Sequence, residues 1–241
     1  MSMTKFDTLV DMQQKSVAAF GNRRLFGTKD RGAWRWLTFA EFGRMVDDFR
    51  GGLADQGITK GDAVAIISAN RVEWAVAAYA TYGLGAMFVP MYEHQLEKDW
   101  DFILRDSGAK LLIASTRSIY DTVKDWPDKL DKLVRVCCMS LPKEDPASFE
   151  ALQSTGREKP VPALDDIDPE SICGFIYTSG TTGKPKGVLL SHNNLVSNVN
   201  ATHEIFPLDP DDCSVSFLPW AHSFGQTVEL HVMLSMGCSV A

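Results

Sequence analysis

Residues 61–92 read GDAVAIISANRVEWAVAAYATYGLGAMFVPMY. Two short apolar runs, 63–68 and 86–90, flank a stretch that we predict to be helical, 72–82. Strands that are apolar throughout and separated by helices are typical of a parallel sheet covered on both faces. The stretch therefore predicts a buried strand–helix–strand unit.

The same alternation continues on both sides of this unit. After it, we predict helices at 96–106 and 117–124 and strands at 110–114 and 133–138. The elements predicted before it are a helix over 4–20, hairpin strands at 24–27 and 34–37, and a helix that starts after the capping-box residue Thr38 and stops at Gly57. The pattern predicts an α/β fold with parallel-rich sheets flanked by helices in layers.

The alternation breaks between residues 139 and 170, where five prolines and an acidic cluster occur. We therefore divide the chain into an N-terminal α/β subdomain (1–140), an acidic Pro-containing connector (141–170) with a short helix near 149–153, and a second α/β region (171–241). The elements predicted in the second region form a βαβ-like series, with strands at 172–177, 188–190, 214–218 and 238–241 and helices at 193–204 and 227–236.

Composition excludes several classes of protein. The chain has 241 residues, is 45% hydrophobic and has a net charge of −7, which argues against disorder and against a nucleic-acid partner. The uncharged stretch 74–92 is interrupted by two glycines and a proline, so a buried helix and strand explain it better than a membrane span. The N-terminus has no secretory-signal pattern.

The five cysteines favour a reducing compartment. Their number is odd and they show no CxxC spacing, so we expect free thiols and a cytoplasmic protein. No pair of cysteines or histidines has the spacing of metal ligands, and we expect no protein-ligated metal.

One loop carries the strongest chemical signal. Residues 177–187 read YTSGTTGKPKG and lie between two apolar runs. Glycines let a backbone approach a ligand closely, and consecutive N–H groups and hydroxyls form a concavity suited to phosphate oxygens. Lys184 and Lys186 are the only lysines or arginines between residues 171 and 241. The residues that we predict to hold phosphate are Thr178, Ser179, Gly180, Thr181, Thr182, Gly183, Lys184 and Lys186.

The loop is not a Walker A motif. Its glycines lack the spacing G-x-x-x-x-G-K-[ST], and Pro185 removes a backbone N–H that such a loop would use. The sequence around 177–188 instead closely resembles the phosphate-loop signature of the AMP-forming adenylating enzymes, which include acyl-CoA synthetases, luciferases and peptide-synthetase adenylation domains.

Two further stretches resemble the same family. Residues 61–70, followed by Glu73-Trp74, are similar to an early strand-and-helix block of acyl-CoA synthetases. Residues 218–224, LPWAHSF, are similar to a Leu-Pro-x-x-His segment, and with Glu229 they are most similar to long-chain fatty-acyl-CoA synthetases. The resemblance spans nearly the whole chain.

The resemblance implies an enzyme that uses ATP, Mg and CoA to convert a fatty acid to an acyl-adenylate and then to acyl-CoA. It implies that His222 forms a wall between the adenylate and the acyl chain. Trp220 and Phe224, two residues to either side, are candidates for the acyl pocket, with plain core packing as the alternative. His192 is expected to cap the following helix, and no partner pattern is visible for the other histidines.

The resemblance also implies that these residues are the N-terminal part of a longer enzyme and are inactive alone, because later family motifs are absent. The apolar run 238–241 is expected to form a bare sheet edge that favours pairing with a second copy of the chain. Peripheral membrane contact is left open. The alternatives are a non-catalytic nucleotide-binding protein and an adenylating relative with another acceptor, such as a carrier-protein thiol.

Overall fold

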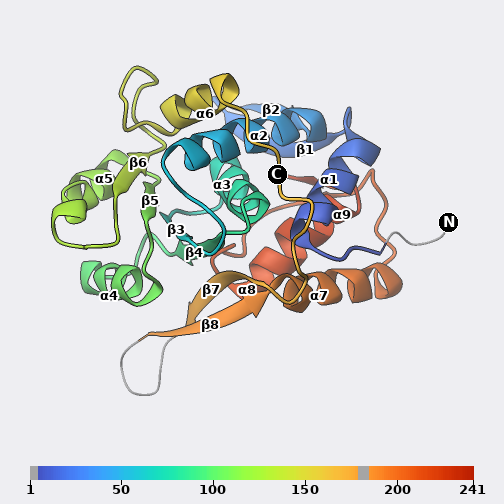
Figure 1. Ribbon diagram of the computed structural model, residues 1–241. Coiled ribbons are helices and arrows are strands. Elements are labelled where there is room, and N and C mark those ends of the chain that lie inside the picture. The colour runs from blue at the N-terminus through green and yellow to red at the C-terminus, as the bar shows by residue number, and fades with distance from the viewer. Residues whose placement is uncertain (1–4, 179–184) are drawn as a thin grey trace.

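The computed structural model describes residues 5–178 and 185–241, which form two β-sheets and the helices that cover them (Figure 1). The larger sheet has six strands in the order β6-β5-β3-β4-β7-β8. Its strands are β3 (Ala63–Ile67), β4 (Met87–Met91), β5 (Leu111–Ala114), β6 (Arg135–Cys138), β7 (Ile172–Thr178) and β8 (Lys186–Ser191). The layered α/β fold expected from the sequence is confirmed.

The centre of this sheet is the predicted strand–helix–strand unit. β3, α3 (Val72–Gly83) and β4 lie within one residue of their predicted bounds, and every residue of β3 is buried. β3 pairs in parallel with β4 on one side and with β5 on the other. Alternate side chains of β3 therefore enter two different cores, as expected for a strand covered on both faces.

Different helices cover the two faces of the sheet. Val64 and Ile66 lie in the core formed with α1 (Leu9–Phe20), α2 (Phe39–Asp55) and α3. Ala65 and Ile67 lie in the core formed with α4 (Glu97–Ser107), α5 (Arg117–Val123) and the 3-10 turn η1 (Trp126–Asp128). α1 starts later than predicted, because Thr8 accepts from the Asp11 N–H and caps the helix.

The predicted connector packs against the first subdomain. Its helix, α6 (Phe149–Glu158), is longer than predicted, and the Phe149 ring stacks on Phe49 of α2 with centroids 4.0 Å apart. A Cβ atom at Gly156 would lie 1.7 Å from the Asp48 carbonyl oxygen, so only glycine permits this closeness of α6 to α2. The proline-rich composition predicted irregular structure but gave no sign of this helix contact.

The second region differs from the predicted βαβ-like series. β7 and β8 form an antiparallel hairpin, and β7 joins the large sheet beside β4. Strands from both sides of the connector thus share one sheet, and the strand pairing crosses the predicted domain boundaries. α7 (His192–Ile205) follows the hairpin directly.

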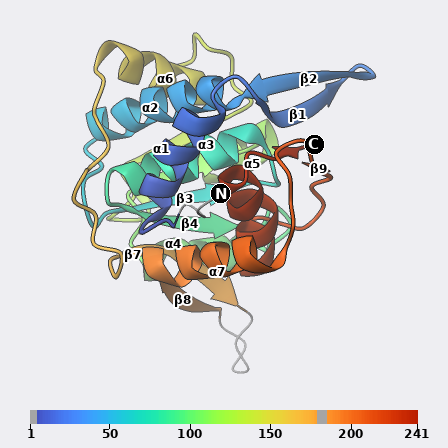
Figure 2. The same cartoon turned by 90° about the vertical axis from the view of Figure 1, so that its right-hand side faces the viewer.

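The smaller sheet joins the two ends of the described chain, with the strand order β2-β1-β10-β9 (Figure 2). It contains the hairpin β1 (Arg24–Asp30) and β2 (Ala33–Thr38) and the short strands β9 (Cys213–Ser214) and β10 (Ser239–Val240). The prediction of a bare edge at 238–241 is wrong, because β10 lies between two strands: Val240 pairs with Phe26 on one side and with Ser214 on the other. The sequence missed this because β1 lies more than 200 residues earlier.

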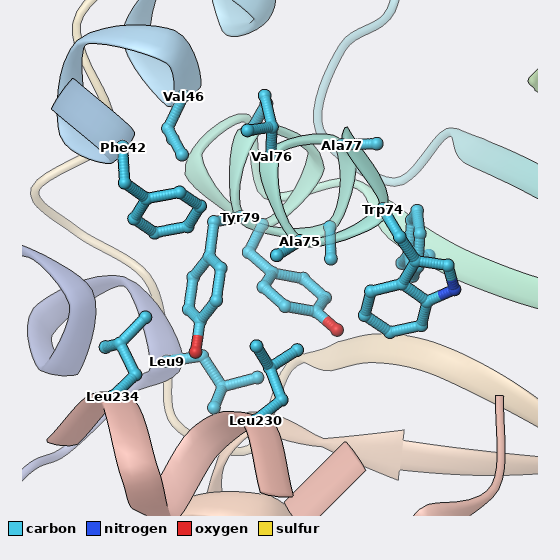
Figure 3. Close-up of a cluster of buried hydrophobic side chains, with 14 of the residues drawn as sticks. Leu9, Phe42, Val46, Trp74, Ala75, Val76, Ala77, Tyr79, Leu230 and Leu234 are labelled. Atoms are coloured by element: carbon cyan, nitrogen blue, oxygen red, sulfur yellow. The ribbon is translucent and has the colours of Figure 1, made fainter. Parts of the chain in front are cut away.

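The last helical segment is irregular and completes the core. α8 (Ser223–Gly225), the π-helical segment η2 (Gln226–Val232) and α9 (Met233–Ser235) follow one another without a break. Leu230 and Leu234 face the aromatic side chains of α3, among them Tyr79 (Figure 3). Within residues 5–178 and 185–241, no helix is long and apolar enough to cross a membrane.

Candidate nucleotide and acyl site

The two ends of the predicted phosphate loop lie opposite each other. Thr178 at the end of β7 pairs with Lys186 at the start of β8, and both residues are exposed. The other residues predicted to hold phosphate lie outside the described residues, namely Ser179, Gly180, Thr181, Thr182, Gly183 and Lys184. The hairpin thus fixes where the loop begins and ends.

The base of the loop is anchored to a helix. The Tyr177 hydroxyl donates a hydrogen bond to Asp106 Oδ2 of α4 at 2.7 Å, and its ring is buried. Burial, followed by the nearby Asp106 carboxylate, raises the pKa of Tyr177 well above its usual value, so this hydroxyl stays protonated and remains a donor. Neighbouring residue Thr178 is therefore held at a fixed point.

Lys186 is available to bind an anion. It is exposed and takes part in none of the ion pairs formed among the described residues. A lysine beside a glycine- and threonine-rich loop supplies a point charge for phosphate oxygens. The predicted role of Lys186 agrees with this exposure.

The segment that contains His222 ends in a turn and is exposed there. His222 is the N-cap of α8, and its Nδ1 accepts from the Phe224 N–H at 3.2 Å. Gly225 follows, where a Cβ atom would lie 2.4 Å from the Pro219 carbonyl oxygen. This close approach folds the chain back directly after His222 and leaves the imidazole at the surface.

Trp220 packs in the core, which was the alternative to a place in the acyl pocket. It is 3% exposed, with ring centroids 5.6 Å from Trp74 and 5.9 Å from Phe26. Trp220 and His222 therefore do not share a face, because the intervening chain turns.

Phe224 lines an apolar groove of about 630 Å³. β8 contributes Leu190 to this groove, and the region after His222 contributes Phe224 and Val228. Its other apolar lining residues are Leu195, Phe206, Leu208, Val232 and Met233. The groove thus lies between the strand that leaves the phosphate loop and the helical segment that follows His222.

A second, more polar cavity of about 310 Å³ lies at the carboxyl ends of β3 and β4. Asn70, Tyr92, Glu93 and Ser216 are among its lining residues. The carboxyl ends of parallel strands are where open α/β sheets bind ligands. Asn70, three residues after the end of β3, was not among the site residues predicted from the sequence.

Two buried histidines stabilise the core beneath the groove. His231 Nδ1 shares a 2.7 Å hydrogen bond with the Tyr79 hydroxyl, and His192 Nδ1 accepts from the Leu9 N–H at 3.3 Å. Burial lowers the pKa of His192 to about 4; burial, then the charge of His192, lowers the pKa of His231 to about 3. The prediction that His192 caps α7 is wrong, because the Ser191 hydroxyl accepts from the Asn194 N–H and is the cap.

The described residues contain no group of three or more His, Cys, Asp or Glu side chains arranged to hold a metal ion. All five cysteines are free thiols, and Cys213 is exposed.

Comparison with solved structures identifies the fold as that of the adenylate-forming enzymes. A long-chain-fatty-acid-CoA ligase from Archaeoglobus fulgidus superimposes with a TM-score of 0.82 at 22% identity, over 99% of this chain and 47% of that one. An anthranilate CoA ligase, AuaEII, in complex with anthranoyl-AMP gives a TM-score of 0.83 at 23% identity, over 99% and 45% of the two chains.

The family model for the AMP-binding enzyme matches residues 13–241, and the chain belongs to this family. A curated relative, the long-chain-fatty-acid–CoA ligase FadD15 of Mycobacterium bovis, is 31% identical over 218 residues, which cover 83% of this chain. The chain spans about a third of the length of that relative.

Proposed function

We propose that the chain is the N-terminal part of an ATP-dependent acyl-CoA synthetase that activates a fatty acid. The observation that carries the proposal is that β8 links two binding features. Lys186 at its start lies at the phosphate loop, and Leu190 near its end lines the apolar groove. One rigid strand can therefore hold a polyphosphate and an apolar chain at a fixed separation.

The groove suits a long alkyl chain. Most of its lining residues are apolar, and Phe224 is 58% exposed at its wall. Each methylene that leaves water contributes about 0.8 kcal/mol, so a long acyl chain gains much more from such a groove than a short one. The names of the curated relatives, which are long-chain fatty-acid ligases, support the same substrate class.

The proposed reaction needs little covalent chemistry from the protein. In the first step, a carboxylate oxygen bonds to the α-phosphorus of ATP and the bond to pyrophosphate breaks, which gives acyl-adenylate and pyrophosphate. Lys186 and the loop neutralise charge on the departing pyrophosphate. Mg²⁺, when bound, supplies further neutralisation on the phosphate oxygens. In the second step, the CoA sulfur bonds to the acyl carbon and AMP leaves.

A substrate panel tests the proposal. The enzyme that carries this chain is incubated with ATP, Mg²⁺, CoA and fatty acids of increasing length, and pyrophosphate, AMP and acyl-CoA are measured. We expect AMP and acyl-CoA in equal amounts, with kcat/KM rising with chain length. Fatty-acid-dependent pyrophosphate release without acyl-CoA would indicate another acceptor, because the acyl-adenylate forms but CoA does not take the acyl group. Nucleotide binding without pyrophosphate release would indicate a non-catalytic protein. Either result contradicts the proposal.

A further inference from the structure

The segment 216–222 has no regular secondary structure, yet it ends at His222. It lies on the surface in part, with Phe217 78% exposed. A segment of this kind needs side-chain partners to keep a single conformation, because no ladder of backbone hydrogen bonds holds it. Besides two backbone hydrogen bonds, from the Ser216 N–H to the Ala241 carbonyl and from the His222 N–H to the Pro219 carbonyl, two polar side chains supply these partners, one from the helix that follows and one from a distant part of the chain.

Glu229 is the first partner. It lies on η2 and is only 4% exposed. Its Oε1 accepts from the Phe217 and Leu218 N–H groups at 3.3 and 3.1 Å, and its Oε2 accepts from the Ser216 hydroxyl at 2.9 Å. Glu229 forms an ion pair with no lysine or arginine of the described ranges.

Asn70 is the second partner. It follows β3 at the carboxyl end of the large sheet and uses both ends of its amide. Its Nδ2 donates to the Leu218 carbonyl at 2.7 Å and to the Ser216 hydroxyl at 2.9 Å. Its Oδ1 accepts from the Trp220 N–H at 2.8 Å.

The Ser216 hydroxyl joins the two partners, since it accepts from Asn70 and donates to Glu229. Burying a carboxylate without a cation is costly unless several donors satisfy it. Apolar side chains could fill the same space, but they could not fix the directions of backbone N–H groups in an irregular segment. The buried carboxylate of Glu229 therefore indicates that the backbone of this segment has to be held in one position.

We propose that Asn70 and Glu229 are positioning residues that clamp segment 216–222 and thereby set the location of His222 for adenylate formation. The proposal rests on the proposed function for its kinetic consequence. The structural claim is that the two side chains hold this segment, and it does not depend on the activity.

Amide hydrogen exchange of the segment tests the structural part. In Glu229→Gln, the amide nitrogen cannot accept a hydrogen bond, so at least one of the three hydrogen bonds that the carboxylate accepts is lost. We therefore expect faster exchange in peptides that cover residues 216–222. Asn70→Ala should give the same result. Peptides from α4 and β5 should exchange as in the wild type in both variants. Unchanged exchange in 216–222 would overturn the clamp, whether or not the protein is an adenylating enzyme.

Steady-state kinetics test the functional part in the enzyme that carries this chain. We expect kcat for pyrophosphate release to fall roughly 10- to 100-fold in each variant, because small misplacements near reacting groups have effects of that size. The KM for ATP should change by less than about threefold, because the phosphate loop is anchored separately. The double variant should lose little more than the worse single variant, because both act on the same segment.

Val123→Ala provides the matched control. Val123 is fully buried on α5 in the other core, so its replacement destabilises the protein without touching the segment or the helix that anchors the phosphate loop. We expect a lowered Tm with unchanged kcat below the transition. Equal kcat losses in Val123→Ala and Glu229→Gln, or full kcat in Glu229→Gln despite faster exchange, would overturn the positioning role. An inactive wild type would contradict the proposed function and leave the exchange result to decide the clamp.

Discussion

The central unit β3-α3-β4 and the C-terminal stretch 213–241 are built by different means. In the central unit nearly every side chain is buried, and strand register follows from apolar side chains alone. In the C-terminal stretch the strands have two residues each, the helix is partly π-helical, and Val215 and Phe217 are 70% and 78% exposed. The difference indicates that apolar packing determines the conformation of the sheet, whereas the conformation of the segment that contains His222 also depends on buried polar side chains.

The largest expected effect contrasts two aromatic side chains. Trp74→Ala removes a fully buried ring of the central unit and should lower the free energy of unfolding by about 3–5 kcal/mol. Phe217→Ala removes an exposed ring from the C-terminal stretch and should change it by less than about 0.5 kcal/mol. Denaturant titrations of both variants measure this. Similar losses would show that the C-terminal stretch is also specified by apolar packing.

The second prediction concerns Lys186. In the enzyme that carries this chain, Lys186→Ala should lower kcat for pyrophosphate release by about 10²–10³, because a charged contact to a developing anion contributes about 2.7–4 kcal/mol. Its Tm should not change, since Lys186 forms no ion pair with a described residue.

Lys132→Ala is the control for Lys186→Ala, because Lys132 is also exposed and lies shortly before β6, the edge strand at the opposite side of the large sheet from β8. It should keep wild-type rates. Rates for Lys186→Ala within threefold of Lys132→Ala would place the phosphate site elsewhere.

The third prediction concerns pH. The pKa of both His192 and His231 is lowered in the folded protein, so the unfolded chain takes up protons first as the pH falls below about 6.5. Stability is therefore full above that pH and falls by about 1.4 kcal/mol per pH unit for each histidine, down to their folded pKa values. Urea titrations between pH 7 and pH 5 measure the slope.

Substitution separates the contributions to this slope. His192→Asn should reduce it, since one of the three histidines whose pKa burial lowers in the folded protein, His192, His203 and His231, is then absent. His94→Asn changes an exposed histidine and should leave the slope unaltered. A pH-independent stability in the wild type would show that neither buried imidazole stays neutral.

The last prediction, a small effect on stability, concerns His222. His222→Ala removes one capping bond at an exposed position and should cost less than about 1 kcal/mol. If His222 separates the adenylate from the acyl chain, the same variant should alter chain-length preference. A large loss of Tm with unaltered preference would instead assign His222 a structural role.

The sequence predicted most of the large sheet and less of the site. β3, α3 and β4 were predictable because apolar runs and helical stretches are local signals. The β7–β8 hairpin was missed, because its loop is longer than the tight turns that mark hairpins in a sequence. Lys186 and Phe224, both predicted site residues, are exposed, and their roles remain predictions. Asn70 was not predicted, because its contacts are to residues about 150 positions away.

The small sheet has a consequence for the order of folding. β1 can pair with β2 as soon as residue 38 is made, but its other edge pairs with β10 at residue 240. During synthesis, one edge of an early hairpin therefore stays open while about 200 residues are added, roughly 10–40 seconds at ordinary elongation rates. Open strand edges invite pairing with other chains. We expect the nascent protein to depend on chaperones through this interval, and the amides of β1 that face β10 to be among the last to gain protection.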